Sequence, residues 1–369
     1  MYNVLFVIWL ITYLVGAVWY VLYLMHMFQQ NSYKPREYRE WMGLHTNVGR
    51  LLGKCLYAII SLPLVLVGSM GCMIGACVMN GMTILVNKPH KAKKPLVYTK
   101  RVRRMLITTG ILYLVAVAVV LLPGLFAGMG NHVVVIQNAG ILPLHPLMRN
   151  VCMVLLLLFI LQPFLILLAN LINHPIEKGI DQYYINVAAR LLREMPNLKV
   201  IGVTGSYGKT SVKYFLNTLL SSQYNVLYTP GNFNTTLGVV RTIRENMKPF
   251  HEIFICEMGA REVGNIKEIC DLVHPDYGII TSIGPQHLQS FHTIENIIST
   301  KFELADAVPE MGKVFLNYDN SYIREHKIEK PVVSYGTTEE NVAFRAYDIE
   351  VSARGSSFKM KDENSVVHD

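Results

Sequence analysis

The chain has 369 residues, of which 51% are hydrophobic and only 16% are charged, with a formal net charge of +8. This composition argues against a wholly soluble protein, and we expect part of the chain to lie in lipid. Apolar runs dominate to about residue 172, and mixed, alternating sequence follows. The length and this change predict an α-helical membrane region at 1–173, a connector helix at 174–197 and an α/β domain at 198–369.

The first region contains stretches that are long and apolar enough to be membrane spans of about 20 residues. The first lacks the basic start and small-residue cleavage site of a signal peptide. The last carries no charge over VCMVLLLLFILQPFLILLANLI, which argues against a helix buried in a soluble core. The predicted stretches are 3–28, 55–86, 105–129 and 151–172.

A basic cluster without acidic residues precedes the third stretch and predicts the topology. Its members are Lys88, Lys91, Lys93, Lys94, Lys100, Arg101, Arg103 and Arg104. Such a juxtamembrane cluster favours a cytoplasmic loop beside anionic lipid over nucleic-acid binding. We therefore expect a multi-pass cell-membrane protein with 130–150 outside and the domain after 172 in the cytoplasm. The loop at 29–54 is also basic, and a hairpin within 55–86, which contains Pro63, would bring both loops to one side.

The start of the second region predicts a phosphate-binding loop between a strand and a helix. Val200–Thr204 is a short apolar run, and helical spacing begins at Thr210. Free backbone N–H groups at such a turn bind phosphate, a lysine neutralises its oxygens and a hydroxyl can ligate Mg²⁺. The GxxxxGK[ST] pattern is incomplete, because Val203 stands at its first glycine. The predicted nucleotide-binding residues are Gly205, Ser206, Tyr207, Gly208, Lys209, Thr210 and Ser211.

Polar side chains also follow the next predicted strands. HEIFICEM (251–258) carries Glu257 at its end, YGIITSIGPQHL leads to His287, and KVFLNYDN carries Asn317 and Asp319. Ligands of an open α/β sheet bind beyond the carboxyl ends of its strands. Each residue alone would suit an ordinary turn, but together they predict one nucleotide site with Mg²⁺.

Several ordered motifs resemble those of the Mur ligases, most closely the MurF type, over about residues 198–358. TGSYGKTSVK is similar to the family's TGSxGKT loop, GNFNTTLGV to its GNxN segment, and EMGA to its acidic strand end. QHLQSFHTIENIISTKFEL and NYDN resemble two later family segments. The resemblance implies a Mur ligase central domain with ATP and one or two Mg²⁺ ions as cofactors.

The resemblance also implies roles for individual residues. Thr210 and Glu257 correspond to ligands of the nucleotide-bound Mg²⁺, and His287 to a ligand of a second metal. Lys301 occupies the position of the family's carbamylated lysine, and together with Lys209 and His287 it would form the catalytic set. The substrate-side segment is Asn232, Asn234 and Thr235, and the nucleotide-side contacts are Asn317 and Asp319.

The activity implied by the resemblance is ATP-dependent amide formation in cell-wall precursor synthesis. A peptide or amino-acid carboxylate would form an acyl phosphate, and an amine co-substrate would then displace phosphate. Membrane stretches replace the usual UDP-binding domain, and the chain stops at Asp369, so we expect a fragment that lacks the amine-binding domain. A polyglutamate-type or other peptide-polymer ligase, and a non-catalytic membrane-bound nucleotide-binding protein, remain as alternatives.

Overall fold

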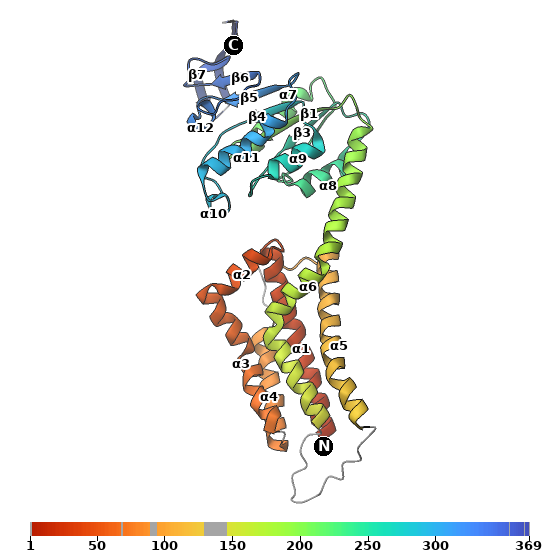
Figure 1. The fold of residues 1–369 in the computed structure, drawn as a ribbon. Coiled ribbons are helices and arrows are strands. Elements are labelled where there is room, and N and C mark those ends of the chain that lie inside the picture. The colour runs from red at the N-terminus through yellow and green to blue at the C-terminus, as the bar shows by residue number, and fades with distance from the viewer. Residues whose placement is uncertain are drawn as a thin grey trace, which may run out of the picture. The chain divides into compact units, whose positions relative to one another are not determined.

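The computed structural model describes residues 2–67, 69–88, 94–128, 146–353, 355–364 and 366–368. The chain divides into two compact units, Met1–Lys178 and Gly179–Asp369. The first is built from helices and the second from a sheet with flanking helices (Figure 1). The predicted outside loop 130–150 lies mostly beyond the described residues, as do Lys91 and Lys93 of the basic cluster.

Long apolar helices make up the first unit. Five helices of the described chain are long and apolar enough to cross a membrane, namely α1, α3, α4, α5 and α6. The short α2 has the opposite character, since it carries Arg36, Glu37, Arg39 and Glu40. The bounds are α1 Tyr2–Gln30, α2 Pro35–Gly43, α3 His45–Val67, α4 Met70–Asn87, α5 Lys100–Gly128 and α6 Pro146–Arg193.

The apolar stretch 55–86 is a hairpin of two helices, α3 and α4, as the basic loops on both sides of it require. α3 ends at Val67, and the hydroxyl of Ser69 caps α4 by accepting a hydrogen bond from Cys72 N at 3.3 Å. The start of α3 and the end of α4 therefore lie together, where Asn87 Nδ2 donates to Lys54 O at 3.2 Å. The described basic residues of 34–54 and of 88–104 consequently share one end of this unit.

Buried aromatic side chains hold α1 against α6 within the first unit. Tyr20 stacks on Phe159 at 5.0 Å between ring centroids. The hydroxyl of Tyr13 donates to Leu155 O at 2.6 Å, which satisfies a polar group that would otherwise be costly to bury. Near the basic end, Arg104 makes a two-pronged pair with Glu177 of α6, at 2.8 Å for each hydrogen bond.

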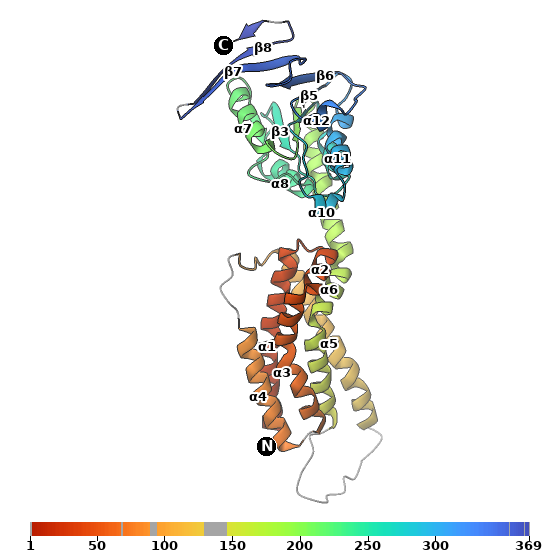
Figure 2. The same ribbon diagram turned by 90° about the vertical axis from the view of Figure 1, so that its left-hand side faces the viewer.

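A nine-stranded sheet in the order β2-β3-β1-β4-β5-β6-β7-β8-β9 forms the second unit. Figure 2 shows the long strands β7 and β8 of this sheet side by side. The pairs from β2 to β7 are parallel, and β8 and β9 are antiparallel additions. The strands are β1 Lys199–Thr204, β2 Val226–Tyr228, β3 Ile253–Glu257, β4 Tyr277–Ile280, β5 Lys313–Asn317, β6 Val332–Gly336, β7 Phe344–Ser352, β8 Gly355–Lys361 and β9 Val367–His368.

Helices cover both faces of the parallel strands. Alternation along β3 sends Ile253 and Ile255 to the face packed by α7, and Phe254 and Cys256 to the opposite core. The core that contains Phe254 and Cys256 also includes buried side chains of α8, α9 and α11. The helices are α7 Lys209–Leu220, α8 Thr236–Asn246, α9 Asn265–Val273, α10 Leu288–Phe291, α11 Ile294–Ala307 and α12 Ser321–Arg324. The unit is therefore an α/β fold with a mostly parallel sheet.

The segment 174–197 does not begin a separate helix, because α6 runs without interruption through Pro163 and Pro175 to Arg193. The last apolar stretch and most of the expected connector are thus one helix of 48 residues. Its C-terminal part already packs on the second unit's core through Ala188, which is fully buried.

Candidate nucleotide and magnesium site

The glycine-rich turn between β1 and α7 adopts a backbone that its glycines make accessible. Gly205 has a φ of 148° and Gly208 a φ of 83°, values that side-chain-bearing residues rarely adopt. A Cβ atom on Gly205 would also lie 2.1 Å from Thr281 Oγ1. The sequence Gly-Ser-Tyr-Gly therefore permits a tight turn that leads directly into the first turn of α7, where Ser211 lies.

The turn after β4 fixes the position of this loop. Ser206 N donates to Ser282 O at 2.6 Å, and Tyr207 N donates to the hydroxyl of Ser282 at 3.1 Å. The Ser206 hydroxyl donates to Gly284 O, also at 3.1 Å. The neighbouring strand end thus preorganises the loop, which reduces the entropy lost when a ligand binds.

Lys209 folds back over the loop at the start of α7. Its ammonium donates to Gly205 O at 2.6 Å and to Ser206 O at 3.2 Å. Burial lowers the pKa of Lys209, and the Glu257 carboxylate opposes that shift. The cation therefore lies beside the helix N-terminus, where both the backbone amides and the helix dipole favour an anion.

Glu257, at the end of β3, gathers three side chains around its carboxylate. The Thr210 hydroxyl lies 3.2 and 3.1 Å from its two oxygens, and Asn234 Nδ2 donates to Oε1 at 3.0 Å. The ammonium of Lys213 lies 2.8 Å from Oε2. The side chains of Lys213 and Glu257 are only 0% and 2% exposed, so this ion pair is buried.

Lys213 is a site residue that the sequence analysis missed. It also donates to Gly231 O at 2.8 Å, which ties α7 to the segment before α8. The sequence contains one signal that Lys213 lies near the site. Lys213 follows Thr210 by three positions, and residues three apart lie on the same face of a helix.

Lys301 and His287 lie within electrostatic range of the loop lysine. Lys301, on α11, is 3% exposed. Burial and the Lys209 charge lower the pKa of Lys301 to about 7, while Glu303 opposes the shift. Burial, Arg261 and the two lysines also lower the pKa of His287, which favours its neutral form at pH 7. His287 has a positive φ of 58° just before α10.

The three predicted substrate-side residues make different contacts in the structure. Asn234 belongs to the Glu257 cluster, whereas the Thr235 hydroxyl caps α8 by accepting from Gly238 N at 3.3 Å. Asn232 O accepts a hydrogen bond from Asn234 N at 2.8 Å and so shapes the turn. The segment therefore places one amide, that of Asn234, directly on the buried carboxylate.

Asn317 and Asp319, the predicted nucleotide-side contacts, stabilise the loops after β4, β5 and β6. Asn317 Nδ2 donates to Thr281 O at 2.9 Å. Asp319 accepts hydrogen bonds from the backbone N–H groups of Thr337, Thr338 and Glu339, between 2.7 and 2.9 Å. Burial raises the pKa of Asp319, but these bonds outweigh it and the net pKa is well below the ordinary value. In this structure both carboxylate oxygens of Asp319 therefore accept hydrogen bonds from the turn at 337–339.

The oxygen donors at this edge suit magnesium. Mg²⁺ prefers hard oxygen ligands and is usually held by one or two carboxylates together with substrate phosphates and water. Thr210 and Glu257 supply such oxygens next to the anion-binding loop. Across the described residues no group of three or more His, Cys, Asp or Glu side chains could hold a metal, and His287 is not gathered with Glu257 into one.

Comparison with known proteins agrees with this geometry. Residues 203–368 match the Mur ligase middle domain. The UDP-N-acetylmuramoyl-tripeptide–D-alanyl-D-alanine ligase of Escherichia coli is 28% identical over 204 residues, which are 52% of this chain and 45% of that protein. The enzyme of the same name from Bacillus subtilis is 33% identical over 175 residues, 47% of this chain and 37% of that protein.

Among solved structures, the MurF ligase of Thermotoga maritima in complex with ADP is 28% identical and has a TM-score of 0.46. The match covers 51% of this chain and 43% of that one. The chain spans less than half the length of the curated relatives named above. Residues 203–368 are therefore a Mur ligase middle domain, similar to that of MurF.

Proposed function

We propose that this protein is a membrane-anchored, ATP-dependent acid–amino acid ligase that acts in peptidoglycan precursor synthesis. The observation that carries the proposal is the cluster of Thr210, Lys213 and Asn234 on the buried Glu257, beside a preorganised glycine loop. The relatives that match this domain are ligases that join D-alanyl-D-alanine to a UDP-N-acetylmuramoyl-tripeptide. By analogy, this chain would form an amide between a peptide carboxylate and an amine.

The loop and its lysine fit the triphosphate of ATP. The backbone amides at the start of α7 would bind phosphate oxygens, and the ammonium of Lys209 would turn from Gly205 O to those oxygens. Thr210 and Glu257 would hold Mg²⁺, which supplies charge neutralisation at the transferring phosphate. Lys213 would keep the Glu257 carboxylate in place, because it is already paired with that group at 2.8 Å.

The reaction that this arrangement supports has two steps. A substrate carboxylate oxygen forms a bond to the γ-phosphorus while the bond between that phosphorus and ADP breaks, which yields an acyl phosphate. The amine nitrogen then attacks the acyl carbon, phosphate leaves, and the amine loses a proton. Positioned cations stabilise the negative charge that develops in both steps, so no protein nucleophile is needed.

Lys301 suits carbamylation, the modification that the resemblance implies. A lysine whose pKa is about 7 is partly neutral at physiological pH, and the neutral amine can attack carbon dioxide with release of one proton. The product is an anion within electrostatic range of Lys209, and it would replace the repulsion between the two lysines, which now lowers the pKa of Lys301, with attraction. We propose that the modified Lys301 contributes to the second metal site together with His287.

The surface of the helical unit supports membrane anchoring. Large apolar side chains point outward on every long helix, for example Ile11, Leu52, Leu85, Ile107 and Leu171, each more than half exposed. Such a continuous apolar surface is unfavourable in water and is expected in lipid.

The topology follows from the ends of the helices. Both basic segments lie at one end of the helical unit, and the Arg104–Glu177 pair brings α6 to the same end. The positive-inside rule puts this end in the cytoplasm. The chain would therefore enter the second unit on the side where ATP is available.

Turnover by the full chain in lipid nanodiscs tests the ligase. ADP release and amide formation would be followed with Mg·ATP, muramyl-tripeptide substrates and D-alanyl-D-alanine, by mass spectrometry of the products. Activity lost in Lys209→Ala and retained when the exposed Lys327 is changed to Ala would support the proposal. Turnover with a different amine alone would favour the peptide-polymer ligase, and ATP binding without any amide product would contradict a ligase acting on its own.

A further inference from the structure

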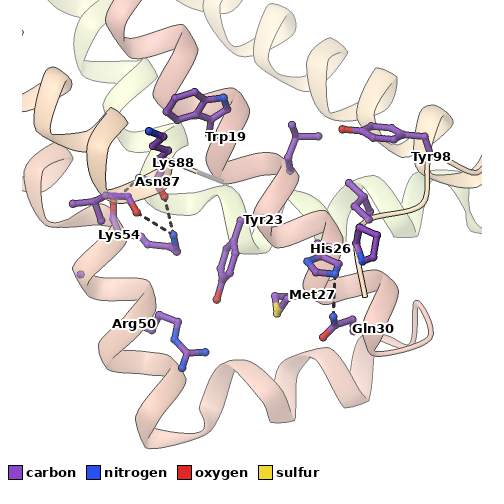
Figure 3. Close-up of a pocket in the computed structure, with 15 residues that line it drawn as sticks. Trp19, Tyr23, His26, Met27, Gln30, Arg50, Lys54, Asn87, Lys88 and Tyr98 are labelled. Carbon is purple, nitrogen blue, oxygen red and sulfur yellow. Dashed lines mark hydrogen bonds between the residues drawn. The ribbon is translucent and has the colours of Figure 1, made fainter. Parts of the chain in front are cut away.

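The helical unit contains a cavity of about 1030 Å³ near its basic end. Figure 3 shows the side chains that line it. They come from the second half of α1, the first turns of α3, the end of α4 and the segment 95–98. The site described above uses none of these residues.

The lining of the cavity has two chemical characters. Trp19, Leu22 and Leu96 contribute apolar surface, whereas Arg50, Lys54 and Lys88 contribute positive charge. An apolar wall beside several cations is suited to an amphiphile with an anionic head and a hydrocarbon chain. Neither a purely apolar ligand nor a small hydrophilic anion would use both parts.

These cations have no acidic partner in the described residues. The acidic residues of 1–178 are Glu37, Glu40 and Glu177. They pair with Lys34, Arg36 and Arg104 respectively, and none of those cations lines the cavity. The cavity therefore concentrates positive charge that no acidic side chain of the helical unit neutralises.

The geometry of Lys54 leaves its ammonium able to bind a ligand. Its hydrogen bonds to Val86 O and Asn87 Oδ1 are long, at 3.4 and 3.5 Å, beyond the usual 2.7–3.2 Å range. The ammonium also lies 4.4 Å from the centroid of the Tyr23 ring, which holds it at the cavity wall. A phosphate oxygen would provide a stronger, charge-assisted hydrogen bond than either amide oxygen.

Hydrogen bonds hold the outer wall in place without a ligand. Gln29 accepts from Val97 N at 3.0 Å and donates to Val97 O at 2.9 Å. His26 Nε2 lies 2.6 Å from Lys94 O. The segment before α5 is thereby fixed on α1, so the cavity is preformed and binding would lose little conformational entropy.

We propose that this cavity binds the phosphate group of a membrane amphiphile, with Arg50 and Lys54 on the phosphate and the chain against Trp19 and Leu96. The inference rests on the membrane insertion proposed above. It adds a lipid-phosphate site in the helical unit, separate from the nucleotide site. The phosphate could belong to a diacyl phospholipid or to a polyprenyl carrier, since both present the same group at the membrane surface.

Equilibrium binding to the full chain in phosphatidylcholine nanodiscs tests the site. The probes are fluorescent phosphatidic acid, a polyprenyl phosphate and inorganic phosphate, the last two as competitors. We expect saturable binding of the fluorescent lipid and displacement by polyprenyl phosphate. Inorganic phosphate should displace it at least 100-fold less well, because it has no chain. An inhibition constant for polyprenyl phosphate below the dissociation constant of phosphatidic acid would identify a polyprenyl carrier as the preferred source of the phosphate, and a higher value would identify a diacyl phospholipid.

Two variants with the same change in charge separate the cavity from the basic surface. Arg50→Gln combined with Lys54→Gln should weaken binding at least tenfold. Arg36→Gln combined with Arg39→Gln removes as much charge from α2, outside the cavity, and should change binding less than twofold. Equal losses in both double variants would show that only surface charge attracts the lipid, and would overturn the proposal.

A third variant fills the cavity and keeps every charge. Gly53 lies on the cavity wall within α3, and a Cβ atom there would meet nothing within 4 Å. Gly53→Leu should therefore fold, occupy the space of the chain and weaken binding at least tenfold. Unchanged binding in this variant would also overturn the site. Release of the wild-type chain from membranes by alkaline carbonate would instead contradict membrane insertion, so the two failures are distinguishable.

Discussion

Replacing Lys213 with Met should selectively weaken the sheet around the nucleotide site. The substitution keeps the length of the side chain but removes the cation that lies 2.8 Å from Glu257 and donates to Gly231 O at 2.8 Å. Removing one member of a buried ion pair costs about 3–5 kcal/mol, because the remaining charge is left without compensation. Since about 1.4 kcal/mol is a factor of ten, the opening equilibrium should rise roughly 10²- to 4 × 10³-fold.

Hydrogen–deuterium exchange of the full chain measures this local opening. Peptides from β1 and β3 should exchange faster by that factor, because these strands pair in parallel register and β3 carries Glu257. The protein has three tryptophans, Trp9, Trp19 and Trp41, all in the helical unit. Their fluorescence should therefore stay unchanged and serve as the internal control.

A matched variant and a double variant complete this test. Lys267→Met breaks an exposed pair with Asp271 in the same unit and should leave exchange in β1 and β3 nearly unaltered. Adding Glu257→Gln to Lys213→Met removes the uncompensated charge and should restore much of the protection. If Lys213→Met alone left exchange within a few fold of wild type, the buried pair would not stabilise this edge of the sheet.

Further predictions concern the nucleotide site, Lys301 and the topology. Lys209→Ala should weaken binding of a fluorescent ATP analogue with Mg²⁺ at least tenfold. The variant should still resist extraction from membranes by alkaline carbonate. Equal affinity of the variant and the wild-type chain for the analogue would contradict the proposed nucleotide site. The pKa of Lys301 is about 7 in the folded chain, against an ordinary value of 10.5. Between these two pH values the unfolded chain binds more protons at this lysine than the folded chain does. The contribution of Lys301 to the free energy of unfolding therefore rises with pH across that window. In buffer free of carbon dioxide, Lys301→Met should therefore stabilise the second unit against urea more at pH 6 than at pH 9, and a gain independent of pH would refute this. Reporter fusions should place Val67 outside and Leu198 inside the cell, and an external signal at Leu198 would contradict both the topology and ATP-dependent function.

Strand ends and the glycine loop were predictable because their signals are local. The apolar run before Gly205, the helical spacing from Thr210 and the carboxylate of Glu257 near the end of HEIFICEM are each contained within a few residues. The topology of parallel strands then brings Glu257 and Thr210 to one edge of the sheet, where the structure places them in contact.

Two aspects of the candidate site needed long-range contacts. Lys213 looks like an ordinary helical lysine in the sequence, and only packing of α7 on β3 buries it against Glu257. Asp319 follows a strand end, as a nucleotide contact would, but its oxygens accept hydrogen bonds from residues 18 to 20 positions later. The spacing from Thr210 puts Lys213 on the same helix face, but for neither residue does the local sequence show which distant segment holds the charge.

The apolar character of the helical unit, the glycine-rich loop between a strand and a helix and the order of the strand-end motifs could be predicted from the sequence alone, because composition and periodicity act over neighbouring residues. A hairpin within 55–86 was already an expectation from the two basic loops, and tertiary structure decided its contacts, such as the hydrogen bond from Asn87 Nδ2 to Lys54 O. It also decided that Arg50 and Lys54 border a cavity with Trp19. The physical reason is that a cavity or a buried ion pair exists only between segments far apart in the chain, and its free energy depends on how those segments pack.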